Sequence, residues 1–424
     1  MQKRQEQVQG IALHLHGIRV GVVARFAGNK NILSFDPEYA ASTSPDRPIV
    51  TLQQLADSGY LQRPQIRTNR LPALLSNLLP EGALRTYHAL RLKIAEDDEF
   101  ILMLSLGRNL PGALIAEPIP AGEIPSWALV AREQAEAIQI APPEEVGDQA
   151  LAGVQMKFSA IKGDGRFNVS QESGDDNWIV KTPSTNHPFV PANEYTAMRL
   201  AESVGVRIPD IDLAPLSAVG ELPNIQLPQE QHAYLIHRFD RHGTQRIHTE
   251  DFAQITEQYA REKYEKVNYQ QMLLIMRSLM DADAFREDME EFVRRLVVNI
   301  LVGNGDAHLK NWTLIYSNGT RPRLSPAYDI VSTVVYIQNE QDFALKLMGT
   351  KRWYDVSLVQ FKALAKELGI RPTLMQKIVK DTVAKAREIW PTLLAELPMD
   401  SKQKALLVEH MNRLHEDFRL NLSA

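Results

Sequence analysis

Short hydrophobic runs separated by turn residues open the chain and predict a small antiparallel sheet. The runs cover residues 11–16, 19–25 and 32–35, and the breaks between them contain Gly17 and the Asn-Lys-Asn sequence at 29–31. Runs of this length, joined by tight turns, are typical of neighbouring antiparallel strands. We therefore expect the first unit of the chain to be built on a β-sheet.

Further along the chain the spacing of hydrophobic positions changes from strand-like to helical. A helix interrupted at Pro80 is expected over 71–92. Strands are expected at 178–181, 208–216 and 234–239. A helix is expected to begin at Asn193 and to continue over 196–204. At least three amphipathic segments are expected between 356 and 420. From residue 248 the chain reads as mostly helical. This order predicts an α+β fold in which a helical part follows a part rich in strands.

A polar loop follows a strongly hydrophobic helix pattern. Residues 292–302 are apolar on nearly every face, so we expect a buried helix there. The next residues, 303–311, place Asp306 and Asn311 five positions apart, and a predicted hairpin then leads to Asp329. Protein kinases present their catalytic base, one metal ligand and a second metal ligand in this order.

These three residue types suit phosphoryl transfer. Asp306 can orient a hydroxyl nucleophile and accept its proton, and the oxygens of Asn311 and Asp329 can bind Mg²⁺. Taken alone, the Gly-Asn-Gly-Asp sequence is equally typical of a simple turn, with Asn311 as a cap of the next element. The buried helix before the loop and the second acid after the hairpin favour the catalytic interpretation.

Composition narrows the class of protein. The chain has 424 residues, which is enough for roughly two to three domains or subdomains. A net charge of −5 argues against a protein whose main task is to hold nucleic acid. The absence of cysteine excludes disulfides and thiolate chemistry. With no secretory signal and no apolar run long enough to span a membrane, we expect a soluble cytoplasmic protein.

The middle of the chain contains candidate nucleotide-binding residues. Residues 151–160 open the next unit and are followed by a turn at 162–165, and a loop with small residues between strands lets backbone N–H groups approach phosphates. Lys181, on a predicted strand, can neutralise a phosphate and can pair with Glu194. A lone lysine on a strand is, however, often simply solvated. The loop also lacks the spaced glycines of the usual kinase sequence. Phe239 ends a strand where a kinase has the hinge between its lobes, and it can flank adenine or simply fill the core.

Short motifs occur in a fixed order over nearly the whole chain. They are Leu78-Leu79-Pro80-Glu81-Gly82, Leu110-Pro111-Gly112-Ala113-Leu114, Leu151-Ala152-Gly153-Val154-Gln155-Met156-Lys157, Ile179-Val180-Lys181, Asn193-Glu194-Tyr195, Arg238-Phe239-Asp240-Arg241, Gly305-Asp306-Ala307-His308-Leu309-Lys310-Asn311 and Tyr328-Asp329. With these motifs in this order, the sequence resembles the HipA-type toxin kinases of bacterial type II toxin-antitoxin modules.

The resemblance implies a two-lobed, protein-kinase-like fold and a serine/threonine kinase that uses ATP and Mg²⁺. The expected units are an N-terminal antiparallel β/α subdomain (1–117), a connector (118–148), a kinase N-lobe core (149–245) and a helical C-lobe (246–424). A helix-turn-helix antitoxin is implied as partner, with the pair bound to operator DNA. Family members phosphorylate an aminoacyl-tRNA synthetase, the glutamyl enzyme in the best-known cases, which arrests growth.

The resemblance also assigns roles to residues. Asp306 would be the base, Asn311 and Asp329 the metal ligands, and Lys181 the phosphate lysine. The phosphate loop would consist of Ala152, Gly153, Val154, Gln155, Met156 and Lys157. The hinge would consist of His237, Arg238 and Phe239, with His308, Lys310 and Tyr328 also beside the nucleotide.

One departure from the family concerns self-inactivation. The family often has a serine just before Leu-Ala-Gly, which the kinase phosphorylates on itself, whereas this chain has Ala150. Without a hydroxyl this position cannot accept phosphate, so we expect this form of self-inactivation to be absent, with Ser159 as a substitute candidate.

Three other functions are compatible with parts of the sequence. A small-molecule kinase of the aminoglycoside-phosphotransferase kind has a similar loop, but Asn304 replaces its histidine and it has no counterpart of the N-terminal unit. A non-catalytic, nucleotide-binding corepressor is a second alternative. A metallohydrolase built on Asp306, His308 and Asp329 is a third, although the intact spacing of Asp306 and Asn311 speaks against it.

Overall fold

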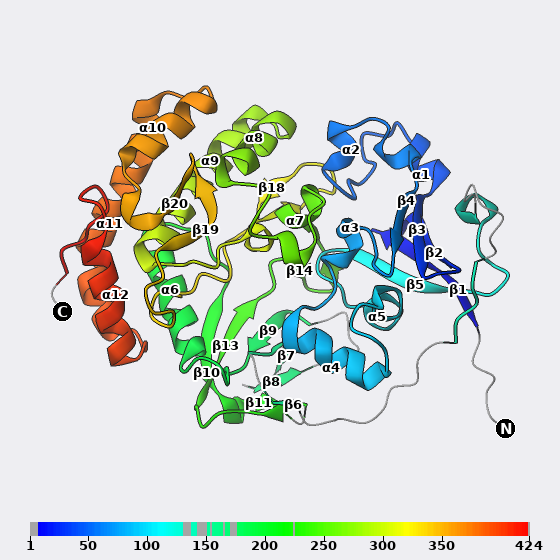
Figure 1. Ribbon diagram of the computed structural model, residues 1–424, viewed down its shortest axis with the longest axis horizontal. Coiled ribbons are helices and arrows are strands. Elements are labelled where there is room, and N and C mark those ends of the chain that lie inside the picture. Colours follow the sequence, from blue (N-terminus) through cyan, green and yellow to red (C-terminus); the bar gives the residue numbers. More distant parts are fainter. Residues whose placement is uncertain are drawn as a thin grey trace.

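The computed structural model describes residues 7–129, 137–141, 151–152, 155–163, 166–169, 176–223 and 225–422, with backbone alone for 151 and 152. Figure 1 shows the N-terminal sheet at one end of the molecule, the C-terminal helices at the other, and a second sheet between them. The predicted α+β fold class is therefore visible in the arrangement of the elements.

A five-stranded antiparallel sheet forms the N-terminal unit, in the order β4-β3-β2-β1-β5. Its strands are β1 (Val8–Leu15), β2 (Ile18–Phe26), β3 (Lys30–Phe35), β4 (Gln65–Thr68) and β5 (Leu114–Pro120). The helices of this unit are α1 (Pro37–Ala41), α2 (Gln53–Ala56), α3 (Ala73–Ser76), α4 (Gly82–Leu92) and α5 (Glu99–Leu106). The predicted antiparallel sheet is confirmed, and so is the helix interrupted at Pro80.

A second sheet, in the order β10-β13-β9-β7-β8-β11, forms the middle of the molecule. Its strands are β7 (Lys157–Gly163), β8 (Arg166–Val169), β9 (Trp178–Lys181), β10 (Ile211–Pro215), β11 (Val219–Gly220) and β13 (His232–His237), and β6 (Leu151–Ala152) pairs separately with β12 (Ile225–Gln226). The strand predicted at 178–181 is confirmed. Tyr87 of α4 packs into the core of this sheet, so the first unit contacts the second.

Helix α6 (Val190–Ser203) packs behind this sheet and begins earlier than expected. The prediction that it starts at Asn193 is wrong by three residues, because Pro191 occupies its first turn, where a missing N–H is harmless. Asn193 and Glu194 therefore lie inside the helix and are buried.

The C-terminal part has one large hydrophobic core that extends from α6 to the end of the chain. Its helices are α7 (Phe252–Ile255), α8 (Tyr269–Leu279), α9 (Ala282–Val302), α10 (Leu358–Glu367), α11 (Pro372–Glu396) and α12 (Ser401–Arg413). Its strands are β16 (His248–Asp251), β17 (Thr313–Tyr316), β18 (Arg323–Leu324), β19 (Asp342–Leu347) and β20 (Thr350–Arg352), and the short pair β14 (Arg241–His242) and β15 (Gln245–Arg246) precedes them.

Most predictions for this part agree with the structure. The buried helix at 292–302 is the second half of α9, and the hairpin after the polar loop is β17 with β18. The mostly helical part opens with a strand that the sequence does not indicate, because His248–Asp251 pairs with β17 before the first helix.

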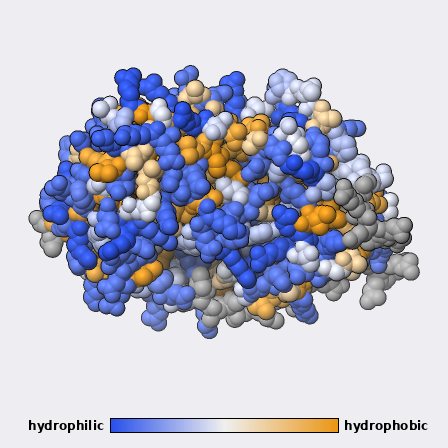
Figure 2. Space-filling view, turned by 45° about the horizontal axis from the view of Figure 1, so that its top comes forward, coloured by the Kyte–Doolittle hydropathy of each residue, from blue (hydrophilic) through white to orange (hydrophobic). Residues whose placement is uncertain are grey.

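Hydrophobic side chains are distributed over the face of the molecule that Figure 2 shows. Within the described ranges no helix combines the length and the apolar character that crossing a bilayer requires. The face drawn in Figure 2 is mostly hydrophilic, with hydrophobic side chains in separate patches. Separate apolar patches of this kind are normal on a protein surface.

Candidate active site

The loop that carries Asp306 is fixed by its own polar groups. Gly303 caps the end of helix α9, and its φ of 61° lies in the left-handed region that glycine tolerates best. The Asn304 side chain accepts from the N–H of Asp306 (3.0 Å), and the Asn311 amide donates to the backbone oxygen of Asp306 (2.9 Å). The two residues predicted as base and metal ligand are thus directly connected.

The Asp306 carboxylate is about half exposed (48%) and faces two aromatic side chains. The Tyr264 hydroxyl donates to Asp306 Oδ1, and His308 Nε2 lies 3.9 Å from the same oxygen. Burial lowers the pKa of His308 to about 4, so the ring is neutral at neutral pH and its contact with Asp306 is not an ion pair. An exposed carboxylate beside neutral groups can accept a proton from a substrate hydroxyl.

Two lysines converge on Asp329. Lys181 Nζ forms an ion pair with Asp329 Oδ1, and Lys157 Nζ lies 3.0 Å from Oδ2. Burial alone would raise the pKa of Asp329, but Lys157 and Lys181 hold it well below its usual range. Asp329 also has a φ of 53°, a conformation uncommon for residues other than glycine and concentrated at functional sites.

Lys181 is held from its other side by Glu194. The Lys181 Nζ to Glu194 Oε1 distance is 2.5 Å, and both side chains are buried. Burial alone would lower the pKa of Lys181, but the carboxylates of Asp329 and Glu194 raise it, so the lysine stays charged. The pairing of Lys181 with Glu194, expected from the sequence, is present.

A small cavity of about 10 Å³ is bordered by two segments, the loop that carries Asp306 and Asn311 and the segment that carries Asp329. Residues from both segments line it, among them Asn304, Asn311, Tyr328 and Asp329. Asn311 and Asp329 therefore face the same space. Together with the Lys181–Asp329 pair and the Asn311–Asp306 bond, this places the four predicted side chains in one region of the molecule.

The predicted phosphate loop is only partly described. Gly153 and Val154 lie outside the described residues, and only the backbone of Ala152 is described, in β6. Met156 is buried, and its N–H donates to Thr182 Oγ1 (3.2 Å) beside Lys181. Gln155 precedes it and is partly buried, and Lys157 reaches Asp329 as described above.

The predicted hinge residues lie at the end of β13. The N–H of His237 donates to the backbone oxygen of Asp210 (2.8 Å), and that of Arg238 donates to the backbone oxygen of Asn177 (2.7 Å). The Phe239 ring packs against Tyr328, with 5.5 Å between ring centroids. An aromatic pair therefore adjoins the segment that carries Asp329.

The Arg238 side chain points into a buried ion network and links the sheet to the N-terminal unit. Its guanidinium donates to Asp176 (2.6 Å) and Asp240 (2.8 Å), and Asp240 also accepts from the N–H of Gly112 (2.7 Å). The Arg238-Phe239-Asp240-Arg241 motif thus anchors the Leu110–Gly112 turn, to which Arg241 donates as well.

Lys310, predicted beside the nucleotide, contacts the N-terminal unit. Its Nζ lies 2.7 Å from Glu81 Oε1 and donates to the backbone oxygen of Asn77 (2.7 Å). Lys263 lies 3.1 Å from the other oxygen of Glu81. Glu81, from the Leu-Leu-Pro-Glu-Gly motif, therefore ties the N-terminal unit to the catalytic loop through two lysines.

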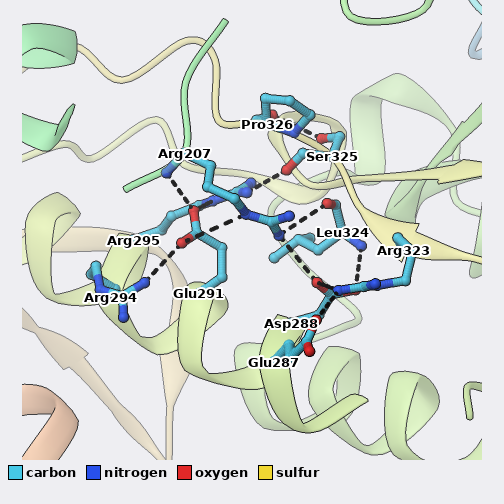
Figure 3. A network of polar contacts seen from close by, with 10 residues as sticks. All are labelled: Arg207, Glu287, Asp288, Glu291, Arg294, Arg295, Arg323, Leu324, Ser325 and Pro326. Carbon is cyan, nitrogen blue, oxygen red and sulfur yellow. Dashed lines mark hydrogen bonds and ion pairs between the residues drawn. The ribbon is translucent and has the colours of Figure 1, made fainter. Parts of the chain in front are cut away.

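A network of charges behind the site, the support network, holds the segment before Asp329. Figure 3 shows Asp288 and Glu291 of α9 surrounded by arginines. Fully buried Asp288 accepts from the N–H of Leu324 (2.7 Å), from Arg323 Nε (2.9 Å) and from Arg207 (3.1 Å). A carboxylate that accepts from this many donors fixes their positions.

Glu291 extends the support network toward the metal-ligand segment. It accepts from Arg294 (2.9 Å) and from Arg295 Nε (2.9 Å), and Arg295 in turn donates to the backbone oxygen of Ser325. The N–H of Ala327 donates to the backbone oxygen of Arg207 (2.7 Å). These bonds hold the strand β18 and the residues after it, which lead directly to Asp329.

Several residues near the site were not identified from the sequence. Tyr264 and Glu81 come from segments distant in the sequence, and Glu340, which accepts from Thr333 Oγ1 (2.6 Å), has its pKa raised to about 7 by burial. Glu81 belongs to the Leu-Leu-Pro-Glu-Gly motif, but nothing in that motif indicates a contact with Lys310. Only the fold brings these residues together.

The structure and its relatives agree on the class of protein. A strand-borne lysine paired with a helix glutamate, followed by an Asp–Asn loop and a second Asp, on two lobes, defines a protein-kinase-like fold. The chain superimposes on a structure described as the Shewanella oneidensis toxin-antitoxin complex of HipA, HipB and operator DNA, with a TM-score of 0.69, 19% identity and 95% of each chain covered. The predicted fold class is confirmed.

Matches to family models show which family of kinases the chain belongs to. The HipA N-terminal domain matches residues 11–117, and the HipA-like C-terminal domain matches residues 149–390. The protein of Sinorhizobium fredii named "Putative kinase Y4dM" is 35% identical over 93% of this chain and 95% of its own length. The serine/threonine-protein kinase toxin HipA of Shewanella oneidensis is 24% identical over 95% and 94% of the two chains. The chain therefore belongs to the HipA family, and the predicted class, a serine/threonine kinase, is confirmed.

Proposed function

We propose that this kinase transfers the γ-phosphoryl group of ATP to a serine or threonine hydroxyl of a protein, with Asp306 as the base. The observation that carries this proposal is that two contacts meet at one cavity. Asn311 is bonded to Asp306, Lys181 is paired with Asp329, and Asn311 and Asp329 line the same cavity. Asp306 orients the acceptor hydroxyl and takes its proton, and Lys181, held by Glu194, neutralises phosphate oxygens. Phe239 and Tyr328 present ring surface to the base of the nucleotide.

Magnesium fits the oxygen atoms that this chain offers. Asn311 and Asp329 line the same cavity and supply the amide and carboxylate oxygens that Mg²⁺ prefers. Bound there, the ion would offset negative charge on the phosphates. The support network behind Asp329 keeps this carboxylate in place, and Asn311 keeps the loop of Asp306 in place.

The biological role we propose is that of a toxin that arrests growth. The chain would phosphorylate an aminoacyl-tRNA synthetase, with the glutamyl enzyme as first candidate, and a helix-turn-helix antitoxin would neutralise it and bind operator DNA with it. The fold shared with a chain solved together with HipB and operator DNA supports these partners.

A labelling experiment tests this function. Purified protein is incubated with labelled ATP, Mg²⁺ and a cell extract, in parallel with an Asp306→Asn variant as control. A labelled protein of synthetase size, absent with the variant, supports the proposal. Label found only in small metabolites would favour a small-molecule kinase instead. Full toxicity of Asp306→Gln, with repression retained, would favour the non-catalytic corepressor.

A further inference from the structure

A tyrosine hydroxyl already occupies the position where the base would meet its substrate. Tyr264 lies between the 3₁₀ turn Ala260–Glu262 and α8, and its hydroxyl donates to Asp306 Oδ1. In the proposed function, Asp306 accepts a hydrogen bond from the acceptor hydroxyl before the phosphoryl group moves. Tyr264 therefore makes, within the same chain, the contact that an acceptor must make.

The backbone next to Tyr264 is tied to the catalytic loop. The N–H of Leu309 donates to the backbone oxygen of Lys263 (3.3 Å), and Lys263 pairs with Glu81 (3.1 Å). The Tyr264 ring meets the His308 ring edge-on, with centroids 5.1 Å apart. These contacts fix the position of the Tyr264 hydroxyl, and Tyr264 as a whole is 39% exposed.

A second tyrosine shows what a purely structural contact looks like here. Tyr269, five positions later, is fully buried and donates its hydroxyl to the backbone oxygen of Ala307 (3.0 Å). It stabilises the same loop without touching Asp306. Tyr264 differs in both respects, because it reaches the carboxylate itself and it lies at the surface, where phosphate can be accommodated.

The hydroxyl is in the protonation state that an acceptor needs. Burial and the neighbouring Asp306 raise the pKa of Tyr264 above its usual value, so the group is protonated at neutral pH and donates to the carboxylate. A proton on the oxygen and a base to receive it are the two requirements for general-base activation of a hydroxyl.

We propose that Tyr264 is a self-phosphorylation site of this kinase, modified within its own chain. The Tyr264 oxygen bonds to the γ-phosphorus of ATP, the bond from that phosphorus to the β-γ bridging oxygen breaks, and ADP leaves with the electron pair. The hydroxyl proton passes to Asp306. The inference rests on the proposed function, since it uses the same base and the same donor.

Mass spectrometry of the full chain tests this site. The protein is incubated with Mg²⁺ and ATP and cleaved after arginine, which places Tyr264 and Tyr269 in one peptide, residues 262–277. Fragmentation of the peptide tells the two tyrosines apart, so buried Tyr269 is an internal control. We expect phosphate on Tyr264, at a rate per molecule that does not change when the protein is diluted.

Variants separate this proposal from the function on which it rests. Tyr264→Phe and Asp306→Asn should abolish the modification, whereas Tyr354→Phe, which removes a hydroxyl bonded to His410 and not to Asp306, should retain it. Phosphate on other side chains or on an added protein, with none on Tyr264, would overturn the proposal and leave the function intact. A rate that rises with protein concentration would also overturn it. No transfer from ATP to any acceptor would refute both.

Discussion

Two groups of charges contact the segment that ends at Asp329, and they are built differently. In the support network, Asp288 and Glu291 each accept from several arginines, and Asp288 also accepts from a backbone N–H. In the site, Lys157 and Lys181 converge on Asp329, whose backbone has an uncommon positive φ.

The difference indicates which charges hold the fold and which serve a ligand. Carboxylates saturated by arginine and backbone donors are fixed in place and contribute to the geometry around them. Lysines are compact, mobile cations that can exchange one anionic partner for another. We infer that the support network determines where Asp329 lies, while the lysines at the site provide charge for phosphate.

Asp329→Asn should have the largest effect of the substitutions considered, and that effect should be a loss of activity. Asparagine tolerates a positive φ as well as aspartate does, so the backbone is not strained. Phosphoryl transfer should fall by roughly 10³-fold, because a charged ligand of the metal is lost. Steady-state kinetics and a thermal melt of the same preparation check this, and a large loss of melting temperature with activity retained would contradict it.

Asp288→Asn should show the opposite pattern. Removing one partner of a buried ion network costs about 3 kcal/mol of stability, since arginine donors are left without their anion. Measured well below the melting temperature, where the variant is folded, activity should fall by a smaller free energy than the stability does. Denaturant unfolding gives the free energy, and unchanged stability together with lost activity would break the comparison.

Glu250 is a third kind of buried acid, because its described partners are uncharged. It accepts from the N–H of Leu52 (2.8 Å) and from the Tyr316 hydroxyl (3.1 Å), and burial raises its pKa from 4.5 to about 8. The folded state therefore favours the protonated acid, and the stability that this residue contributes is present below about pH 4.5 and is lost as the pH rises toward 8.

Glu250→Gln should remove that pH dependence. The wild-type unfolding free energy should decline between these two pH values by on the order of 3 kcal/mol relative to the variant. Urea unfolding across this range checks the difference between the two proteins. Parallel curves for the two proteins would show that Glu250 ionises in the folded state without cost.

Glu81→Gln should have the smallest effect of the four substitutions. Glu81 pairs with Lys310 and Lys263, and its side chain is 33% exposed, so solvent screens the pairs and the loss of stability should be about 1 kcal/mol. Burial opposes ionisation, but the two lysines lower the pKa of Glu81 from 4.5 to about 2. The stability it contributes is therefore present above about pH 4.5 and is lost as the pH falls toward 2.

Circular dichroism recorded during an acid titration of wild type and variant checks the prediction for Glu81. The two proteins should differ at neutral pH and converge in acid. A constant difference down to the lowest pH would contradict the assignment of the effect to this carboxylate.

Local patterns predicted those parts of the fold that depend on neighbours in the sequence. Strands β1, β2, β3 and β9, the buried half of α9 and the hairpin of β17 with β18 all follow from runs of apolar residues and the turns between them. The spacing of Asp306, Asn311 and Asp329 also indicated a shared site, because a loop and a hairpin keep these residues close along the chain.

Contacts between distant segments could not be predicted in this way. His248–Asp251 lies where the sequence is expected to turn mostly helical, but it forms a strand because β17 lies beside it. Tyr264 reaches Asp306 from 42 positions away, and Lys310 meets Asn77 and Glu81 from the N-terminal unit. The start of α6 was the exception, since Pro191 was a local signal that indicated it.

The most direct test of the central claim is the binding of ATP with Mg²⁺ to the wild type and to two variants by titration calorimetry. If Lys181, Asp306, Asn311 and Asp329 serve one nucleotide, Asp306→Asn should bind ATP nearly as tightly as wild type while losing transfer, and Asp329→Asn should lose the gain in affinity that Mg²⁺ provides. ATP binding that is the same in all three proteins, with and without Mg²⁺, would show that the nucleotide lies elsewhere.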